Sequence, residues 1–380
     1  MLKEIWSYRY LGRIDFRILP IIAMFIMISL AVMSSMDAHM SVEHDGFFSP
    51  LVKSQLRGFG VGILGFIFFA GFDYNKLREW TWILYFIMII VLIGVFFTGS
   101  IQSVHRWYRI PIINVAFQPS EYSKLSVVIA LSWFLERRSS RAREWNTALL
   151  AGVIVGIPFL LILKQPDLGT ALVLLPIVLV MFYFGDIHPF VTRCMAAVMI
   201  TGVAIVSMFF LEIISHEEFR PYATKVIKEY QYERLNPETH HQWASVTAIA
   251  VGGMTGEGWK KSEFTGGGWL PAAHTDSVFS AFGEEFGFLG LLLLLVLFYS
   301  LIYFSFRVSA VAKDPFGRLL AVGVSVYLAI HIIINIGMMT GFLPITGVPL
   351  LLVTYGGSSI LSTMIALGIL QSIYSRRFMF

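Results

Sequence analysis

The sequence of 380 residues is poor in charge and in cysteine. Only 14% of its residues are Asp, Glu, Lys or Arg and 57% are hydrophobic, whereas an ordinary soluble domain is roughly 25% charged. This composition excludes a water-soluble globule. A single cysteine excludes an intramolecular disulfide. The net charge of +4 comes from cations that lie between apolar runs, where they set membrane orientation, so nucleic acid is not an expected partner.

Ten apolar runs approach the length that a membrane crossing needs, which is roughly 20 helical residues for a hydrocarbon core of about 30 Å. We therefore predict an all-α integral membrane protein with ten transmembrane helices, in a single polytopic domain over residues 1–380. The predicted helix cores are 16–36, 56–72, 80–98, 123–135, 147–163, 170–184, 194–214, 276–306, 317–339 and 358–374.

Lys and Arg occupy every second connection, starting with the N-terminal segment. The basic positions are Lys3, Arg9 and Arg13, then Lys76 and Arg78, then Arg137, Arg138, Arg141 and Arg143, then Arg193, then Arg307 and Lys313, and last Arg376 and Arg377. Because cytoplasmic loops carry an excess of Lys and Arg, both termini are predicted to be cytoplasmic. The longest outer connection, residues 215–275 between the seventh and eighth helices, is then a large extracytoplasmic loop, and loops of that length are usually functional or disordered.

Ionisable residues inside or beside membrane helices are costly and are functional hypotheses by default. At the entry to the fourth helix, Gln118 precedes Glu121 and Lys124, which share a helix face and can neutralise each other. They form either a structural ion pair or part of a polar cavity that opens to the outer face. In the next outer turn, Asp167 either caps the following helix or faces the same cavity together with Lys164.

The long outer loop ends in His274, Thr275 and Asp276, where the eighth helix begins. An aspartate in the first turn of a helix is stabilised by the helix dipole, so capping alone would explain Asp276. Capping does not require the two residues before it, however. A carboxylate at the membrane surface is well placed to act as general base on a substrate hydroxyl.

A polar stripe continues inward along the eighth helix, because Ser277, Ser280 and Glu284 recur at helical spacing. Two adjacent carboxylates inside a bilayer, Glu284 and Glu285, must be protonated, hydrated or paired. Lys124 is a candidate partner. A purely structural network that fixes helix register is the alternative.

The last outer connection, residues 341–359, is uncharged and broken by Gly and Pro, and Asn335 precedes it. Irregular backbone at membrane depth is tolerated only where it is buried in protein or lines a watery cavity, so we expect a re-entrant segment. The N–H groups of Gly356 and Gly357, with Ser358, either bind an anion such as a pyrophosphate or only cap the tenth helix.

Two further patterns indicate no site. His240, His241 and His274 lack the spacing of metal ligands, so no protein-built metal site is predicted. The glycine-rich run at 252–258 lacks the Gly-Lys-Ser/Thr ending of a phosphate-binding loop, which excludes nucleotide binding.

Together these motifs resemble the SEDS family of bacterial membrane proteins, and the similarity covers nearly the whole chain. The motifs that carry it are Arg106-Trp107 with Phe117 to Glu121 and Lys124, Lys164 to Thr170, His274-Thr275-Asp276, Asn335 to Met338, and the Pro-Ile-Thr-Gly-Val-Pro and Tyr-Gly-Gly-Ser-Ser runs. Several of them are closer to the family's cell-elongation branch than to its division branch.

The resemblance implies a peptidoglycan glycosyltransferase with ten membrane helices in the bacterial inner membrane. Such enzymes polymerise lipid II, a disaccharide-pentapeptide on undecaprenyl pyrophosphate, at the outer face for cell elongation and shape. The implied partners are a class B penicillin-binding protein, which is a transpeptidase, and the elongation machinery. The family's essential aspartate maps onto Asp276, its fourth-helix pair onto Glu121 and Lys124, and its Pro-Asp aspartate onto Asp167.

The resulting hypothesis is that Asp276 deprotonates the sugar 4-hydroxyl of an acceptor lipid II, which attacks the lipid-linked glycan and releases undecaprenyl pyrophosphate. Arg106, Arg109, Lys124 and Lys164 are expected to offset the charge of that leaving group. A divalent cation, Mg or Mn, is a further candidate for this role, and no organic cofactor is expected. The alternatives are a flippase for lipid-linked cell-wall precursors, a role in division instead of elongation, and a noncatalytic scaffold.

Overall fold

The computed structural model describes residues 5–40, 46–98, 106–110, 115–210, 213–214, 216–225, 229–232, 236 and 239–378. This part of the chain is almost entirely helical. Its strands are β1 (Tyr108–Ile110) and β2 (Val115–Phe117), a short antiparallel pair in which Arg109 is aligned with Ala116. Three 3₁₀ turns accompany the helices, namely η1 (Tyr8–Arg13), η2 (Val95–Phe97) and η3 (Ser139–Arg141).

Ten helices of 17 residues or more lie within the described ranges, and each overlaps one of the predicted helix cores. They are α2 (Ile18–Met40), α3 (Pro50–Gly71), α4 (Tyr74–Gly94), α5 (Pro119–Arg137), α6 (Trp145–Lys164), α7 (Leu168–Phe184), α8 (Pro189–Phe210), α13 (Val278–Val311), α14 (Pro315–Met339) and α15 (Gly357–Ser375). Eight of them are long and apolar enough to cross a membrane, whereas α7 is shorter and the polar α5 does not qualify. The helical membrane fold is confirmed, and the count of ten spans stays a prediction.

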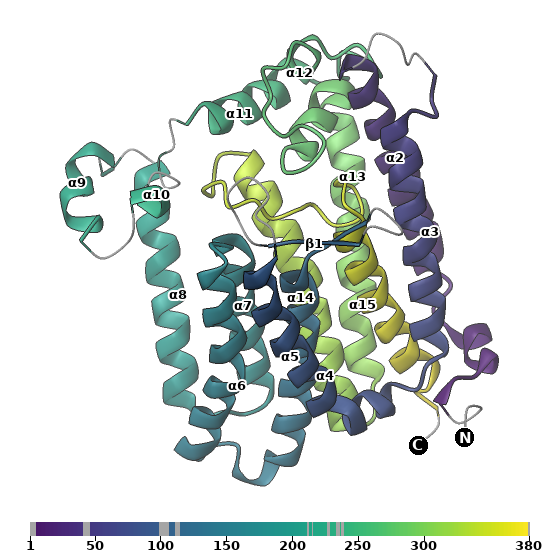
Figure 1. Ribbon diagram of the computed structural model, residues 1–380, viewed down its shortest axis with the longest axis vertical. Coiled ribbons are helices and arrows are strands. Elements are labelled where there is room, and N and C mark those ends of the chain that lie inside the picture. The colour runs from purple at the N-terminus through teal and green to yellow at the C-terminus, as the bar shows by residue number, and fades with distance from the viewer. Residues whose placement is uncertain are drawn as a thin grey trace.

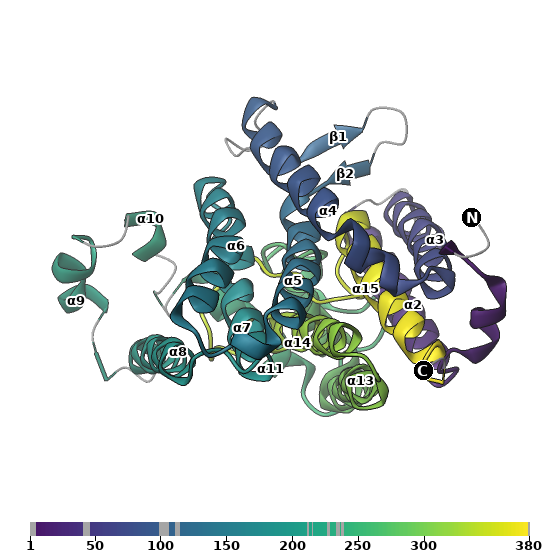
Figure 2. The same cartoon turned by 90° about the horizontal axis from the view of Figure 1, so that it is seen from below.

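The long helices lie side by side in one bundle (Figure 1). The central helix is α14, which packs against α13, α7 and α5. Of the apolar stretch of 18 residues that qualifies it as a membrane span, 72% is buried inside the protein. At the edge of the bundle lies α8 (Figure 2), for which the same share is 6%. The closest pair is α3 and α15, where a Cβ at Gly368 would lie 2.8 Å from the main-chain oxygen of Phe66; small residues permit such an approach.

Both termini lie at one end of the bundle (Figure 1), and ion pairs join several helices at this end. Arg78 contacts Glu136 at 3.1 Å and Asp314 at 2.7 Å, so it joins the ends of α4, α5 and α14. Arg376, at the end of α15, lies 3.7 Å from Asp73 at the start of α4. Four helix ends that carry predicted cytoplasmic charges therefore meet on the same side of the molecule.

The connection between α8 and α13 supplies short helices of its own, and parts of it lie outside the described residues. They are α9 (His216–Ala223), α10 (Glu229–Tyr232), α11 (His240–Gly252) and α12 (Glu263–Gly266). The last two cover the end of the bundle opposite the termini (Figure 1), and α11 packs on α13 and α14. The boundaries 215–275 and the single domain over 1–380 stay predictions.

The helix α13 is interrupted at Gly287, which has a φ of 62° and a ψ of −166°. The glycine-rich run that follows α11 docks against this break. The N–H of Glu257 donates to the main-chain oxygen of Glu284 at 3.0 Å, and the N–H of Phe288 donates to that of Gly253 at 2.8 Å. The run is thus a main-chain clip that holds the long loop against α13.

Candidate active site

Asp276 lies in the turn that leads from the long loop into α13, and its main chain is anchored to α14. The side-chain amide of Asn335 donates to the main-chain oxygen of Asp276 at 3.0 Å and to that of Val348 at 2.8 Å. Asn335 is completely buried, whereas Asp276 is half-buried. A Cβ at Gly347 would lie 3.6 Å from Asp276 Oδ2, so the carboxylate lies beside the segment between α14 and α15.

That segment, residues 340–356, contains neither helix nor strand, as the Gly and Pro pattern predicts. It holds the turn before Asp276 by hydrogen bonds to main-chain oxygens of that turn. The N–H of Tyr355 donates to the oxygen of His274 at 3.0 Å, and the hydroxyl of Thr354 donates to the oxygen of Thr275 at 3.0 Å. Burial lowers the pKa of His274, so its ring is neutral at pH 7.

On the other side of Asp276, the loop helix α11 contacts the next residue. His241 Nε2 lies 2.7 Å from the hydroxyl oxygen of Ser277, which is buried. Burial, and secondarily the neighbouring His240, lower the pKa of His241. A neutral imidazole therefore forms this hydrogen bond, and it ties the long loop to the start of α13.

Asp167 is the N-terminal cap of α7 and also binds the entry to α5. Its carboxylate accepts from the N–H of Thr170 at 3.4 Å and from the Thr170 hydroxyl at 3.0 Å. The Ser120 hydroxyl at 2.9 Å and the Gln118 amide at 3.0 Å both donate to Oδ2. The capping interpretation is confirmed, and the same carboxylate brings Gln118 into this cluster.

Arg106 lies above the same turn, where its guanidinium donates to the main-chain oxygen of Gln165 at 3.0 Å and to that of Pro166. Lys164 is exposed at the end of α6. The main chain of Arg109 belongs to β1, and its side chain lies outside the described residues. Of these three predicted cations, the structure thus places Arg106 and Lys164 at the C-terminal end of α6.

The start of α15 is bonded to protein groups. The N–H of Gly356 donates to Gln55 Oε1 at 3.4 Å, and the N–H of Gln118 donates to the Ser358 hydroxyl at 3.1 Å. Gly357 is the first residue of the helix. No side-chain hydrogen bond of the N-cap residue Gly356 caps α15, so capping and anion binding by Gly356 and Gly357 both stay predictions.

Below the Asp167 cluster lies a buried charged network inside the bundle. Lys124 Nζ is 2.7 Å from Glu121 Oε1 and 2.7 Å from His331 Nε2. The side chains of Lys124 and Glu121 are 0% and 2% exposed. Sequence reasoning missed His331, although it lies four residues before Asn335 and therefore on the same face of α14.

The candidate pairing of Lys124 with the α13 carboxylates is wrong. Glu284 instead accepts from the N–H groups of Phe264 at 2.8 Å and Thr265 at 3.0 Å, and from the Thr265 hydroxyl. The carboxylate is completely buried and binds α12 to α13. The face of α13 that carries Glu284 is turned toward the long loop and not toward α5.

The segment between α14 and α15 links the clusters around Asp276 and Asp167. At the start of α7, a Cβ at Gly169 would lie 2.4 Å from the main-chain oxygen of Thr346, so only glycine permits this approach. One residue further on, Gly347 adjoins the carboxylate of Asp276. Asp276 and Asp167 therefore flank one irregular segment from two sides.

The described geometry can be compared with known proteins. The family model named for FtsW, RodA and SpoVE, described as a cell cycle protein, matches residues 16–377. The chain belongs to the SEDS family.

Individual relatives of this SEDS protein carry both branch names of the family. It is 33% identical over 344 residues to the probable peptidoglycan glycosyltransferase FtsW of Trichlorobacter lovleyi, which covers 87% of this chain and 84% of that protein. It is 32% identical over 339 residues to the peptidoglycan glycosyltransferase MrdB of Escherichia coli K12, with 86% of each chain covered. Stage V sporulation protein E of Bacillus subtilis is also 32% identical, over 355 residues.

Two solved structures share the fold. One was described in work on the structural coordination of polymerization and crosslinking by a peptidoglycan synthase complex, with a TM-score of 0.73, 26% identity, and 96% of this chain and 98% of that chain covered. The rod shape determining protein RodA of Thermus thermophilus has a TM-score of 0.68 at 24% identity, with the same coverage. Its likeness shows the fold alone.

A metal site is the remaining question for this SEDS chain. Within the ranges that the structure describes, no group of three or more His, Cys, Asp or Glu side chains is arranged to hold a metal ion. The chain's own donors in those ranges thus do not fit a closed metal site. A divalent cation stays a prediction, and no step below depends on it.

Proposed function

We propose that this SEDS protein is a peptidoglycan glycosyltransferase that polymerises lipid II into glycan strands, with Asp276 as the general base. The relatives from Trichlorobacter lovleyi and Escherichia coli are named as such enzymes, and the chain aligns with most of the length of each. The fold of the synthase-complex component covers 96% of this chain. Family and fold therefore both support the activity.

The observation that carries the proposal is the support of Asp276 through its main chain. Asn335 and the Thr354 hydroxyl fix the main-chain oxygens of Asp276 and Thr275. A catalytic base must be held within hydrogen-bond reach of the proton that it takes. These hydrogen bonds fix the backbone from which the Asp276 carboxylate extends. Asp276 is half-buried next to Ser277, which α11 contacts, and we propose that a lipid-linked sugar reaches it there.

In the proposed step, Asp276 takes the proton of the acceptor's sugar 4-hydroxyl while that oxygen attacks the anomeric carbon of the donor. A new C–O bond forms, the bond from the anomeric carbon to the pyrophosphate oxygen breaks, and undecaprenyl pyrophosphate leaves with the electron pair. One in-line displacement inverts the anomeric configuration. Arg106, Arg109 and Lys164 are the proposed cations that offset the charge of the leaving group, whereas Lys124 is buried against Glu121 and His331.

The orientation in the membrane follows from the charges at the end that holds the termini. That end carries Arg78 and Arg376 and the basic turn between α5 and α6. Because basic ends face the cytoplasm, we place the termini inside and Asp276 on the outer face of the bacterial inner membrane. Lipid II and the lipid-linked glycan then bind from the outer leaflet.

The proposed partner is a class B penicillin-binding protein, whose transpeptidase activity would cross-link the new strand. The 26% identical structure comes from a peptidoglycan synthase complex in which polymerization and crosslinking are coordinated.

We further propose that the chain serves cell elongation, as the motifs at 164–170 and 335–338 indicate. Identities of 33% to an FtsW and 32% to an MrdB do not separate the two branches. Depletion in the parent bacterium decides between them, because loss of elongation rounds the cells and loss of division makes filaments.

The activity is tested with the purified protein, alone and with its transpeptidase partner, incubated with labelled lipid II and a divalent cation. Wild type is expected to make glycan ladders. Asp276→Ala is expected to lower the rate by at least about 100-fold, since a general base typically contributes 10²–10⁴-fold. Asp186→Ala is the matched control, because it removes an exposed carboxylate that pairs with Arg143 at 3.0 Å on the basic side.

The outcomes separate the candidate functions. Ladders from wild type and Asp186→Ala but not from Asp276→Ala support the proposal. Equal ladders from wild type and both variants would remove Asp276 from the mechanism. Absence of ladders in every sample, while a control polymerase uses the same lipid II, would favour a flippase or a scaffold. A flippase would depend more on Lys124 and Glu121 than on Asp276.

A further inference from the structure

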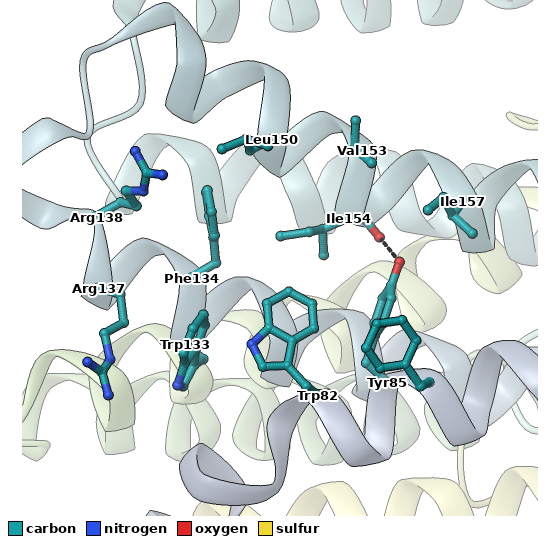
Figure 3. Close-up of a pocket in the computed structure, with 11 residues that line it drawn as sticks. Trp82, Tyr85, Trp133, Phe134, Arg137, Arg138, Leu150, Val153, Ile154 and Ile157 are labelled. Carbon is teal, nitrogen blue, oxygen red and sulfur yellow. Dashed lines mark hydrogen bonds between the residues drawn. The ribbon is translucent and has the colours of Figure 1, made fainter.

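A groove lies between α4, α5 and α6, away from the candidate active site (Figure 3). Its volume is about 440 Å³, within the roughly 300–1,000 Å³ of ordinary ligand sites. The helix α5 separates the two places. Ser120 in its first turn contacts Asp167, whereas Arg137, its last residue, lines the groove. At 1.5 Å per residue the two ends are about 27 Å apart.

The walls of the groove are aromatic and aliphatic. Trp82 and Trp133 meet edge to face with ring centroids 5.3 Å apart, and Val153 and Ile157 form the facing wall on α6 (Figure 3). Val153 is 56% exposed and Ile157 is 43% exposed, so the groove opens on the surface of the isolated chain. Such a surface is suited to an apolar chain from the surrounding bilayer.

A proline shapes the floor of the groove. Pro158 lies inside α6 and has no N–H, so the main-chain oxygen of Ile154 lacks its usual helical donor. The Tyr85 hydroxyl donates to that oxygen at 2.8 Å (Figure 3). This bond joins α4 to α6 and satisfies the main-chain acceptor, which leaves the floor compatible with hydrocarbon.

One end of the groove is basic (Figure 3). The Arg137 guanidinium lies 5.5 Å from the centre of the Trp133 ring, and that of Arg138 lies 6.0 Å from the Phe134 ring. In the described part of the chain, no carboxylate oxygen lies within 4.0 Å of either guanidinium. The neighbouring Glu136 instead pairs with Arg78 at 3.1 Å. Two cations that lie over aromatic rings therefore line one end of the groove.

We propose that this groove binds an anionic phospholipid, with one acyl chain between the Trp82 and Ile157 walls and the phosphate against Arg137 and Arg138. The apolar walls fit an acyl chain and the two arginines fit a phosphate, and a phospholipid carries both groups in one molecule. A soluble anion makes no use of the apolar walls, and a zwitterionic lipid gains less from two arginines, since juxtamembrane cations attract anionic headgroups. The site is independent of the proposed catalytic function.

The test is native mass spectrometry of the purified full chain, titrated in detergent with phosphatidylglycerol or with phosphatidylcholine of the same acyl composition. Wild type is expected to retain phosphatidylglycerol in preference. The double variant R137Q/R138Q is expected to bind it roughly 30-fold more weakly, given the attraction per juxtamembrane cation. The matched control R141Q/R143Q removes the same charge from the same turn but outside the groove lining. It is expected to bind within about twofold of wild type, because its cations do not face the groove.

A second variant separates the groove from surface charge. V153W keeps every cation and fills the cavity, so it is expected to lose the bound phosphatidylglycerol. Wild-type affinity in R137Q/R138Q, or an equal loss in the R141Q/R143Q control, would overturn the proposal in favour of general surface electrostatics. Retention of the lipid by V153W would overturn it as well. The thermal midpoint of each variant, compared with that of wild type, verifies that it is folded before its binding is read.

Discussion

The side-chain amide of Asn335 donates a hydrogen bond to the main-chain oxygen of Asp276 at 3.0 Å. The same nitrogen bonds Val348 O at 2.8 Å, so one buried amide joins α14, the turn before α13 and the irregular segment. The contact is made to the main chain of Asp276, so it fixes the position of the backbone that carries the carboxylate. In the proposed mechanism Asn335 is a positioning residue.

Replacement of Asn335 by Ala is expected to lower the polymerisation rate at least tenfold, because the Asp276 turn loses its anchor to α14. Two main-chain oxygens also lose a donor, which costs about 1–3 kcal/mol when such a group stays buried. The measurements are kcat and KM on lipid II together with the thermal midpoint. We expect kcat to fall more than KM changes.

The matched control for this prediction is Thr340→Ala on the same helix end. Within the described residues, the Thr340 hydroxyl bonds oxygens of the preceding helix alone, at Ile336 and Gly337. It is expected to retain wild-type kcat. An Asn335→Ala variant with wild-type kcat and a lowered thermal midpoint would show that Asn335 serves stability alone.

The buried pair of Lys124 and Glu121 predicts strong coupling between two substitutions. Removal of one partner leaves an uncompensated charge inside the bundle, which typically costs about 3–5 kcal/mol. Lys124→Met and Glu121→Leu are each expected to lower the thermal midpoint sharply, and the double variant is expected to recover much of the loss. A double-mutant cycle on thermal midpoints measures the coupling. Additive losses would mean that each side chain is stabilised by other groups, with His331 the first to examine.

Much of the fold was predictable because membrane helices are defined by long apolar runs. All ten predicted cores overlap a helix of the structure, including the polar α5, where Glu121 and Lys124 were predicted to share a helix face. The capping position of Asp167 was also predictable from residue type and position, whereas the catalytic role of Asp276 stays a prediction. The clip at Gly287 was not, because it is formed by hydrogen bonds between segments some 30 residues apart, which no local pattern records.

The errors at the site have a common physical cause, which is the rotation of each helix about its axis. Composition shows that Glu284 lies in α13, but not that its side chain faces α12. The i, i+3 spacing of Glu121 and Lys124 correctly indicated their contact because it is local. His331 and His241 gain their importance from neighbours on other helices, and these neighbours follow from tertiary packing alone.

The break in α13 predicts an unusually severe glycine substitution. Gly287 has a φ of 62°, and a Cβ there would lie 2.3 Å from the N atom of Gly256. Gly287→Ala is therefore expected to displace the clip and reduce the folded yield and the thermal midpoint. The control is Gly152→Ala in α6, where a Cβ would meet nothing within 4 Å and where Ala is favoured over Gly by roughly 0.5–1 kcal/mol. Equal midpoints for the two variants would contradict the clip.

Two histidines next to Asp276 predict how stability depends on pH. Burial lowers the pKa of both His241 and His274 below the ordinary value of 6.5, so the folded protein binds fewer protons there than the unfolded chain. Stability then rises with pH wherever the unfolded state holds more protons. The contribution is full above about pH 6.5 and is lost as the pH falls from there toward the lowered pKa values. The thermal midpoint of wild type is expected to decrease between pH 7.5 and pH 5.5.

The double variant His241→Gln/His274→Gln removes both titrating groups and is expected to show a smaller decrease over the same interval. Its midpoint at pH 7.5 is expected to be lower than that of wild type, since the bond from His241 to Ser277 is lost. His188→Gln, at the start of α8 and distant in the chain from Asp276, is the control and should retain the wild-type slope. A double variant with the full wild-type decrease would assign the pH dependence to other groups. It would show that protonation of His241 and His274 does not change the stability of the protein.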